Sequence, residues 1–134
     1  MDAMVIKKKI TLIGSKGKMD LDAIFDSGST YSCIHPDIAK EIEILTPLPN
    51  PKKFLTAKEG EIAVARMCVR LDFLLKGYTF SDEFMVVDGL SHPVIIGAKT
   101  LQAWRLKLDF ENDDVIINPE VTKLWMLKNE ARES

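Results

Sequence analysis

The feature that most constrains the fold of this chain is an alternation of apolar and other residues with a period of two. Between residues 62 and 74 it gives one face of mainly apolar side chains: Ala63, Ala65, Met67, Val69, Leu71 and Phe73. Residues 19–25 and 104–110 alternate in the same way. Because successive side chains of a strand point to opposite faces, this pattern is typical of half-buried strands. The sequence therefore predicts a mostly-β, closed or barrel-like domain.

Turn residues divide the chain into hairpins, shorter strands and two short helices. The turns Gly14–Gly17 and Lys76–Gly77 predict an N-terminal hairpin of residues 4–25 and a second hairpin of residues 62–87. Further strands are expected at residues 31–34, 94–97, 104–110, 115–117 and 121–127, and helices at residues 36–41 and 98–103.

The segment between the first helix and the second hairpin has two parts. Residues 46–51 hold three prolines, which predict a stiff loop without regular structure. Residues 54–62 are expected to form two strand arms around a small polar tip.

Length and composition indicate one domain with an ordinary core. The 134 residues are 46% hydrophobic, which is enough to bury a core without disulfides or a metal. We expect one domain over residues 1–127 and a loose charged tail over residues 128–134. The sequence shows no internal repeat, so the chain carries one copy of any site.

Charge, hydropathy and cysteine content limit the partners and the compartment. Eighteen basic residues against twenty acidic ones give a net charge of −2, so a nucleic-acid partner, which needs a strongly basic face, is not expected. No apolar run approaches the ~20 residues that span a membrane. Cys33 and Cys68 are interpreted as reduced thiols, with a single disulfide as the alternative. The first residues of the sequence show no signal-peptide pattern. Together with the reduced thiols, this predicts a cytoplasmic location.

The segment most suggestive of chemistry is Asp26-Ser27-Gly28-Ser29, which follows the apolar strand end Ala23–Phe25. An acid at the end of an apolar strand is poorly solvated, and Gly28 allows the backbone to turn tightly beside it. Two interpretations are open. Asp26 is either a catalytic carboxylate or the polar first residue of an ordinary turn, since Asp-Ser-Gly is common in turns.

A second segment, Ile95-Ile96-Gly97, lies about seventy residues downstream and precedes the helix expected at residues 98–103. Asp26-Ser27-Gly28-Ser29 resembles the active-site turn of aspartic proteases, and Ile95-Ile96-Gly97 followed by Leu101 resembles the second half of the same motif. Residues 55–62 lie where these enzymes carry a flap hairpin. The order, spacing and length resemble the retropepsin-like, or retroviral-type, branch over residues 5–110.

The resemblance implies a closed β-barrel-like acid protease fold and an aspartic endopeptidase. Asp26, Ser27 and Gly28 would form the catalytic turn, with Gly28 donating its backbone N–H to the Asp26 carboxylate. The residues that the resemblance places near the substrate are Ser29, Thr30, Thr56, Ala57, Lys58, Ile95, Ile96 and Gly97. Because this family needs two carboxylates and the chain has one Asp-Ser-Gly, the enzyme would be a homodimer acting on a peptide or protein, with Ser27 hydrogen-bonding across its interface.

Three departures from the retroviral pattern favour an alternative. The expected flap tip is charged and poor in glycine, Ala98 and Lys99 stand where retroviral enzymes have arginine and asparagine, and the chain continues well past the helix. The arginine helps to brace the retroviral dimer. The alternative is therefore a non-catalytic, protease-like dimerisation or peptide-binding module.

Other chemistries find little support. His35 and His92, with the two cysteines, have no ligand spacing, so we expect no metal and no cofactor. Neither histidine has partners that suggest a Ser-His-Asp triad, and Ser27 and Ser29 lack the context of a nucleophile elbow.

Overall fold

The computed structural model describes residues 5–56 and 61–120. Its elements, in chain order, are β1 (Val5–Gly14), β2 (Gly17–Asp26), β3 (Cys33–Ile34), α1 (Pro36–Ile42), β4 (Thr46–Leu55), β5 (Ile62–Leu75), β6 (Tyr78–Val86), β7 (Val94–Ile96), α2 (Ala98–Ala103), β8 (Lys107–Asp109) and β9 (Asp114–Ile116). The mostly-β fold with two short helices confirms the fold class predicted from the sequence. The strand expected at residues 121–127 and the tail lie outside the described residues.

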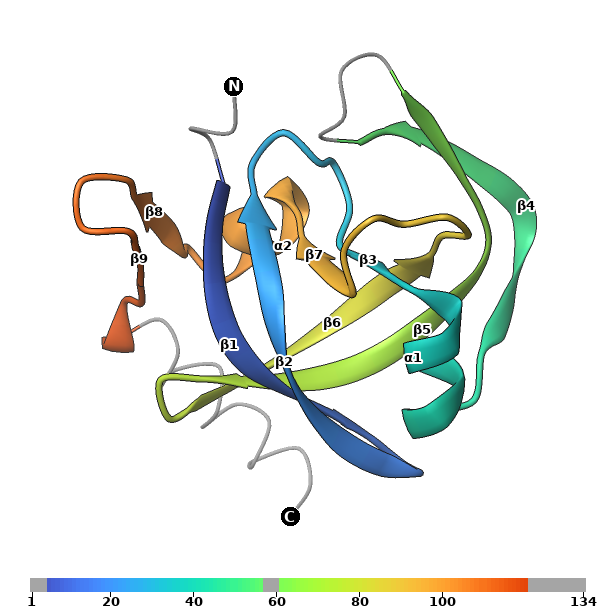
Figure 1. Ribbon diagram of the computed structural model, residues 1–134, viewed down its shortest axis with the longest axis horizontal. Coiled ribbons are helices and arrows are strands. Elements are labelled where there is room, and N and C mark those ends of the chain that lie inside the picture. Colours follow the sequence, from blue (N-terminus) through green and yellow to red (C-terminus); the bar gives the residue numbers. More distant parts are fainter. Residues whose placement is uncertain (1–4, 57–60, 121–134) are drawn as a thin grey trace.

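The strands close into a barrel because β1 pairs on both of its edges. It pairs antiparallel with β2 along its whole length and with β5 through residues 11–13. The ring therefore runs β1, β2, β7, β3, β6, β5 and back to β1 (Figure 1). β5 is long because it completes this ring at its C-terminal end and pairs with β4 at its N-terminal end.

Two tight turns form where the sequence predicts them. β1 and β2 pair from Gly14↔Gly17 to Val5↔Asp26, which makes the N-terminal hairpin. β5 and β6 are joined at Lys76 and Gly77, whose φ angles are 52° and 84°. Two successive residues with positive φ match the right-handed twist of the strands, which suits glycine at the second position.

The prediction of a loop without regular structure at residues 46–51 is wrong, because these residues belong to β4. β4 pairs with β5 only along one edge in the described structure, and its register shifts between Pro47 and Lys52. An edge strand with a bulge tolerates proline, because an N–H missing from the unpaired part costs no ladder hydrogen bond.

The strand predicted at residues 104–110 is shorter in the structure. Only Lys107–Asp109 forms a strand, β8. The backbone N–H of Trp104 caps α2 by donating to the carbonyl of Thr100, and Arg105 has a φ of 52° that breaks extended geometry. The apolar alternation here therefore reflects a helix end followed by a short strand.

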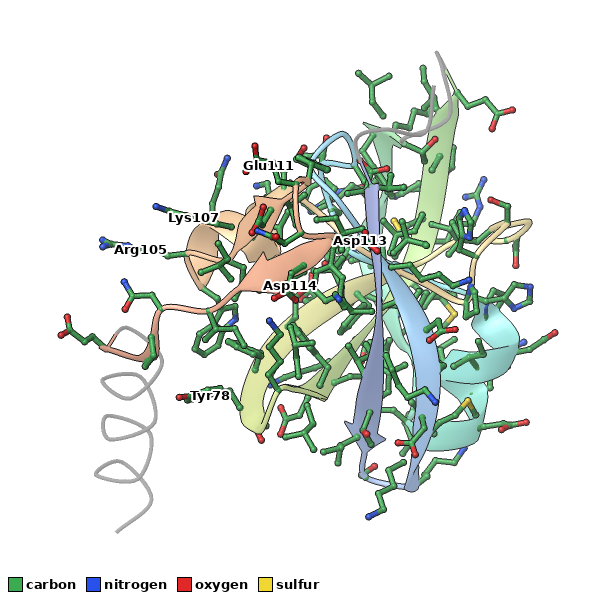
Figure 2. All side chains as sticks on the ribbon, turned by 60° about the vertical axis from the view of Figure 1, so that its left-hand side comes forward. Tyr78, Arg105, Lys107, Glu111, Asp113 and Asp114 are labelled. Atoms are coloured by element: carbon green, nitrogen blue, oxygen red, sulfur yellow. The ribbon has the colours of Figure 1, made fainter. Side chains whose placement is uncertain are left out.

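The β8–β9 hairpin is held on the barrel by Val115, which is buried in the main core, and by ion pairs of Asp114. The carboxylate of Asp114 accepts from the Lys76 ammonium at 2.7 Å and lies 3.5 Å from the Lys8 ammonium. Figure 2 shows Arg105 and Lys107 projecting away from the barrel on this side. The hairpin thus adds a small second layer beside β1.

Two apolar clusters fill the barrel and its upper end. The main core contains four fully buried phenylalanines: Phe25, Phe73, Phe80 and Phe84. A second cluster, called the upper cluster below, includes Ile24, Cys33, Phe54, Ala63, Met85 and Ile95. Since Ile24 belongs to one cluster and Phe25 to the other, the end of β2 is covered on both faces. Asp26, the next residue, is therefore buried where β2 ends.

In the described residues, neither helix has the length and apolar character needed to cross a membrane.

Candidate active site

Asp26 is buried at the end of β2, with only 3% of its surface exposed. Its Oδ1 accepts a hydrogen bond of 2.7 Å from the backbone N–H of Gly28, and its backbone carbonyl accepts from the N–H of Ser29. The Gly28 contact is the one expected from the sequence. A Cβ at position 28 would lie 3.1 Å from Oδ1, so glycine allows the backbone to come this close to the carboxyl group.

No cation is paired with Asp26 in the described part of the chain. The ion pairs there involve Asp37 and Asp114. A carboxyl group that is buried without an opposite charge is costly for a fold to keep. Such groups concentrate at functional sites, so the burial of Asp26 favours the catalytic interpretation over an ordinary turn.

The loop after Asp26 is held by the segment that follows β7. β2 and β7 run parallel, with Ile24 opposite Ile95 and Phe25 opposite Ile96. At the end of β7, the backbone N–H of Ala98 donates to the carbonyl of Ser29 at 2.7 Å. The N–H of Lys99 donates to the carbonyl of Thr30 at 3.2 Å. The start of α2 therefore fixes the loop that leaves Asp26.

Gly97 makes this contact possible. A Cβ at position 97 would lie 2.5 Å from the carbonyl carbon and oxygen of Tyr31 and 2.7 Å from the carbonyl oxygen of Ser29. Any side chain would push the two segments apart. The two isoleucines before it fill different cores, since Ile95 belongs to the upper cluster and Ile96 to the main one.

A cleft of about 850 Å³ opens beside Asp26. The end of β2 contributes Ile24, Asp26 and, just beyond it, Gly28 to its lining, and β7 contributes Ile95. Thr56 and Ile62, from the ends of β4 and β5, line the cleft as well. The lining is mixed: apolar side chains alternate with the charged residues Lys7, Glu61 and Asp113. A concave site with apolar walls and a few polar groups is the usual form of a site that binds a substrate.

A protein-family model described as aspartyl protease matches residues 11–100. This chain belongs to the aspartyl protease family. The matched segment contains the Asp26 turn, the β4–β5 hairpin and the Ile95-Ile96-Gly97 motif, and the retropepsin-like resemblance seen in the sequence is confirmed.

The fold of this chain is also found in a solved structure. The crystal structure of the retroviral protease-like domain of Ddi1 from Leishmania major is similar with a TM-score of 0.63. The two chains are 16% identical, and the similarity covers 86% of this chain and 89% of that one. At this identity the likeness shows a shared fold. No curated protein matches the chain.

The residues that the sequence places in the protease site divide into a surface group and a supporting group. Asp26, Gly28, Thr56 and Ile95 line the cleft. Ser27 is exposed beside Asp26, and Thr30 is half-buried. Ser29, Ile96 and Gly97 are buried behind the loop, so their position is a supporting one, and direct contact with a substrate stays a prediction. Ala57 and Lys58 lie outside the described residues.

One wall of the protease cleft was not predicted as part of the site. It comes from the connection between β6 and β7 and consists of Val87, Asp88, Gly89, Leu90, Ser91 and His92. In the sequence this stretch looks like an ordinary polar turn. Only the position of this connection could have indicated its role, because the connection directly precedes β7, which pairs with the end of β2.

Cysteine chemistry is not supported at this site. Cys33 is fully buried in the upper cluster, and burial raises the pKa of its thiol to about 11. At neutral pH the group is therefore a protonated thiol and a poor nucleophile. Both cysteines are free. The described residues contain no group of three or more His, Cys, Asp or Glu side chains arranged to hold a metal ion.

Proposed function

We propose that this protein is an aspartic endopeptidase that acts as a homodimer. The observation that carries the proposal is the buried carboxyl group of Asp26, which has no ion-pair partner among the described residues and accepts from Gly28 N–H at the wall of the cleft. Membership of the aspartyl protease family supports the same reaction class.

The need for two chains follows from the chemistry. Hydrolysis by this class of enzyme uses two carboxyl groups that face one water molecule, and the chain contains a single Asp-Ser-Gly. Asp88-Gly89 and Asp113-Asp114, both at turns, lack that pattern. A two-fold axis beside Asp26 supplies the second carboxyl group, because such an axis sets each residue opposite its own copy.

The two Asp26 carboxyl groups divide the work by sharing one proton. The ionised one removes a proton from the bound water, whose oxygen attacks the scissile carbonyl carbon. The protonated one donates to the carbonyl oxygen, giving a tetrahedral diol. When the diol collapses, the C–N bond breaks. The carboxyl group that took the proton of water gives it to the leaving nitrogen, and the other, now ionised, takes the proton of one diol hydroxyl. Gly28 N–H keeps each carboxyl group in its orientation throughout.

The exposed residues near Asp26 have roles at the interface and over the cleft. Ser27, exposed in the single chain, hydrogen-bonds across the axis and ties the two loops together. The β4–β5 hairpin, whose ends pair at Leu55↔Ile62 and through Thr56 N–H to the Glu61 carbonyl, closes over the substrate. Closure of such a hairpin excludes bulk water from the reaction.

Mixing wild type with Asp26→Asn tests both the catalytic role of Asp26 and the need for a dimer. The variant is expected to have no measurable peptidase activity on an unfolded protein substrate. After exchange of subunits, adding an equal amount of the variant lowers wild-type activity to about half, because mixed dimers hold one competent carboxyl group. An exposed acid on α1, Glu41, gives the matched control Glu41→Gln, which leaves activity unchanged. Full activity of Asp26→Asn would refute the catalytic role.

The second candidate is a peptide-binding module without catalysis. Ala98 stands at the position where retroviral enzymes carry the bracing arginine, and its methyl side chain cannot form the hydrogen bonds of a guanidinium group. Saturable binding of unfolded peptides by wild type, without cleavage at any pH between 3 and 8, identifies this function instead.

A further inference from the structure

A chain of buried polar groups connects α2 to β6 behind the Asp26 loop. The backbone N–H of Gly97 donates to Ser32 Oγ at 3.1 Å. Ser32 Oγ lies 2.7 Å from Thr100 Oγ1, and Thr100 Oγ1 donates to the carboxylate of Asp82. Ser32 and Thr100 are almost completely buried, with 2% and 3% of their surface exposed. The peptidase chemistry proposed above uses none of these side chains directly.

The direction of the hydrogen bonds in this chain is determined by its two ends. Gly97 N–H can only donate, and an ionised Asp82 can only accept. Since Thr100 donates its single hydroxyl proton to Asp82, it has none left for Ser32. The Ser32 proton is therefore directed toward Thr100 and Asp82, and the Ser32 oxygen accepts from Gly97. Hydrogen bonds aligned in this way strengthen one another. Without the acceptor at Asp82, neither hydroxyl has a fixed orientation.

This chain of hydrogen bonds, called the relay below, ends on the segment that carries Asp26. Ser32 closes the loop that begins at Asp26, and its carbonyl accepts from Met85 N–H at 2.8 Å on β6. Gly97 packs against the backbone of Tyr31. A shift of Ser32 relative to Gly97 therefore changes how the whole loop lies on α2.

We propose that Asp82 is a positioning residue for the Asp26 loop, acting through Thr100 and Ser32 on Gly97. The inference rests on the proposed peptidase function for its effect on catalysis, whereas the relay itself is a property of the fold. Asp82 touches neither the cleft nor Asp26. It sets the loop from behind, and its effect falls on the rate of the chemical step more than on substrate binding.

The electrostatics of Asp82 agree with this role. Burial raises the pKa of its carboxyl group, and the charge of Glu83 raises it further. Hydrogen bonds from the Thr100 and Ser32 hydroxyls and from the backbone N–H of Glu83 lower it. The relay is therefore the main source of stabilisation for the ionised form. Partly burying a charged carboxyl group costs free energy, and an apolar side chain would fill the same space without that cost.

Four variants separate the relay from bulk packing. Asp82→Ala removes the terminal acceptor, and Thr100→Val removes the hydroxyl at nearly constant shape. Asp82→Asn keeps an acceptor oxygen and Thr100→Ser keeps the hydroxyl, so both serve as matched controls. At a temperature where all four are folded, we expect kcat to fall about tenfold in the first pair, with KM within about twofold of wild type. The controls stay close to wild type.

A second readout does not depend on peptidase activity. Amide hydrogen exchange at Gly97, followed by NMR, is expected to be slow in wild type, Asp82→Asn and Thr100→Ser. It is expected to be about tenfold or more faster in Asp82→Ala and Thr100→Val, because the acceptor Ser32 is no longer held. If wild type cleaves no substrate, the proposed function fails while the exchange rates still test the relay.

The results that overturn the inference are specific. Unchanged kcat and unchanged Gly97 exchange in Asp82→Ala would show that the relay positions nothing. Equal impairment of Asp82→Asn and Asp82→Ala would show that the acceptor is not the property that matters. A double variant Asp82→Ala/Thr100→Val that loses no more than either single variant supports one connected relay, and simple additivity of the two losses contradicts it.

Discussion

The Asp26 carboxyl group depends on glycines for its surroundings. Gly28 brings a backbone N–H to 2.7 Å from Oδ1, and Gly97 brings α2 against the loop. The sequence predicted the Gly28 contact, because Asp-Ser-Gly is a local pattern with a known chemical meaning. It singled out Gly97 as part of the second motif but placed it near the substrate. It could not predict that Ser29 and Ile96 lie behind the cleft, since burial depends on which segment packs against them.

The first prediction concerns Gly97→Ala. The added Cβ meets the Tyr31 carbonyl group at 2.5 Å, so the free energy of unfolding should fall by about 3 kcal/mol. Gly77→Ala is the control, because its φ of 84° is strained but nothing lies within 4 Å of the new Cβ. It should cost only about 1 kcal/mol. Urea unfolding measures both, and equal losses would contradict the steric explanation.

The second prediction concerns the thiols. Burial raises the pKa of Cys33 to about 11 and also raises that of Cys68, so a thiol reagent at pH 8 should react slowly with the native protein and rapidly after unfolding in urea. Cys33→Ser and Cys68→Ser assign the two reactions. Rapid, stoichiometric modification of Cys33 in the native state would show that the upper cluster is open to solvent.

At the scale of elements, the errors of sequence analysis have a common cause. Residues 46–51 looked like a loop because proline breaks ladders, yet β4 lies at an edge with a bulge, where a missing N–H is harmless. Residues 104–110 looked like a strand because they alternate, yet Trp104 ends a helix. Local patterns do not reveal whether a strand has one neighbour or two, or where a helix stops.

The third prediction concerns the junction between α1 and the β1–β2 turn. Glu43 accepts from the Ser15 hydroxyl and, at 2.7 Å, from its backbone N–H, and these bonds lower the pKa of Glu43 below its ordinary value of 4.5. A carboxyl group whose pKa is lower in the folded state stabilises the fold above its unfolded pKa. That stabilisation is lost as the pH falls through the folded pKa.

Glu43→Gln should therefore be less stable than wild type at pH 7, and the difference should shrink as the pH falls below 4.5. Urea midpoints measured across this range test the sign, with Glu41→Gln, on the same helix, as the control for a solvated acid. A difference that grows toward low pH would contradict the assignment of the Ser15 bonds.

At the scale of the whole molecule, the sequence predicted the closed barrel because three segments show period-two patterns and the motif order limits the topology. It could not predict the closing contact, in which residues 11–13 of β1 meet residues 72–74 of β5. That contact joins distant segments with no special residues. The β6–β7 wall of the cleft was missed for the same reason.

The fourth prediction concerns oligomeric state. If two Asp26 residues are needed, specific peptidase activity should fall on dilution once the protein concentration drops below the dimer dissociation constant. Sedimentation at the same concentrations should show dimers giving way to monomers over the same range. Constant specific activity across a change from dimer to monomer would require a catalytic group within one chain.

The parallel pairing of β2 with β7 has a consequence for biosynthesis. Asp26 leaves the ribosome early, but Ile95, Ile96 and the glycine that seat its loop are made about seventy residues later. Joining such distant segments carries a loop-closure entropy that must be offset by contacts formed last. A nascent chain therefore holds its acid without the support that shapes the cleft. The cleft therefore takes shape only after residue 97 has been synthesised.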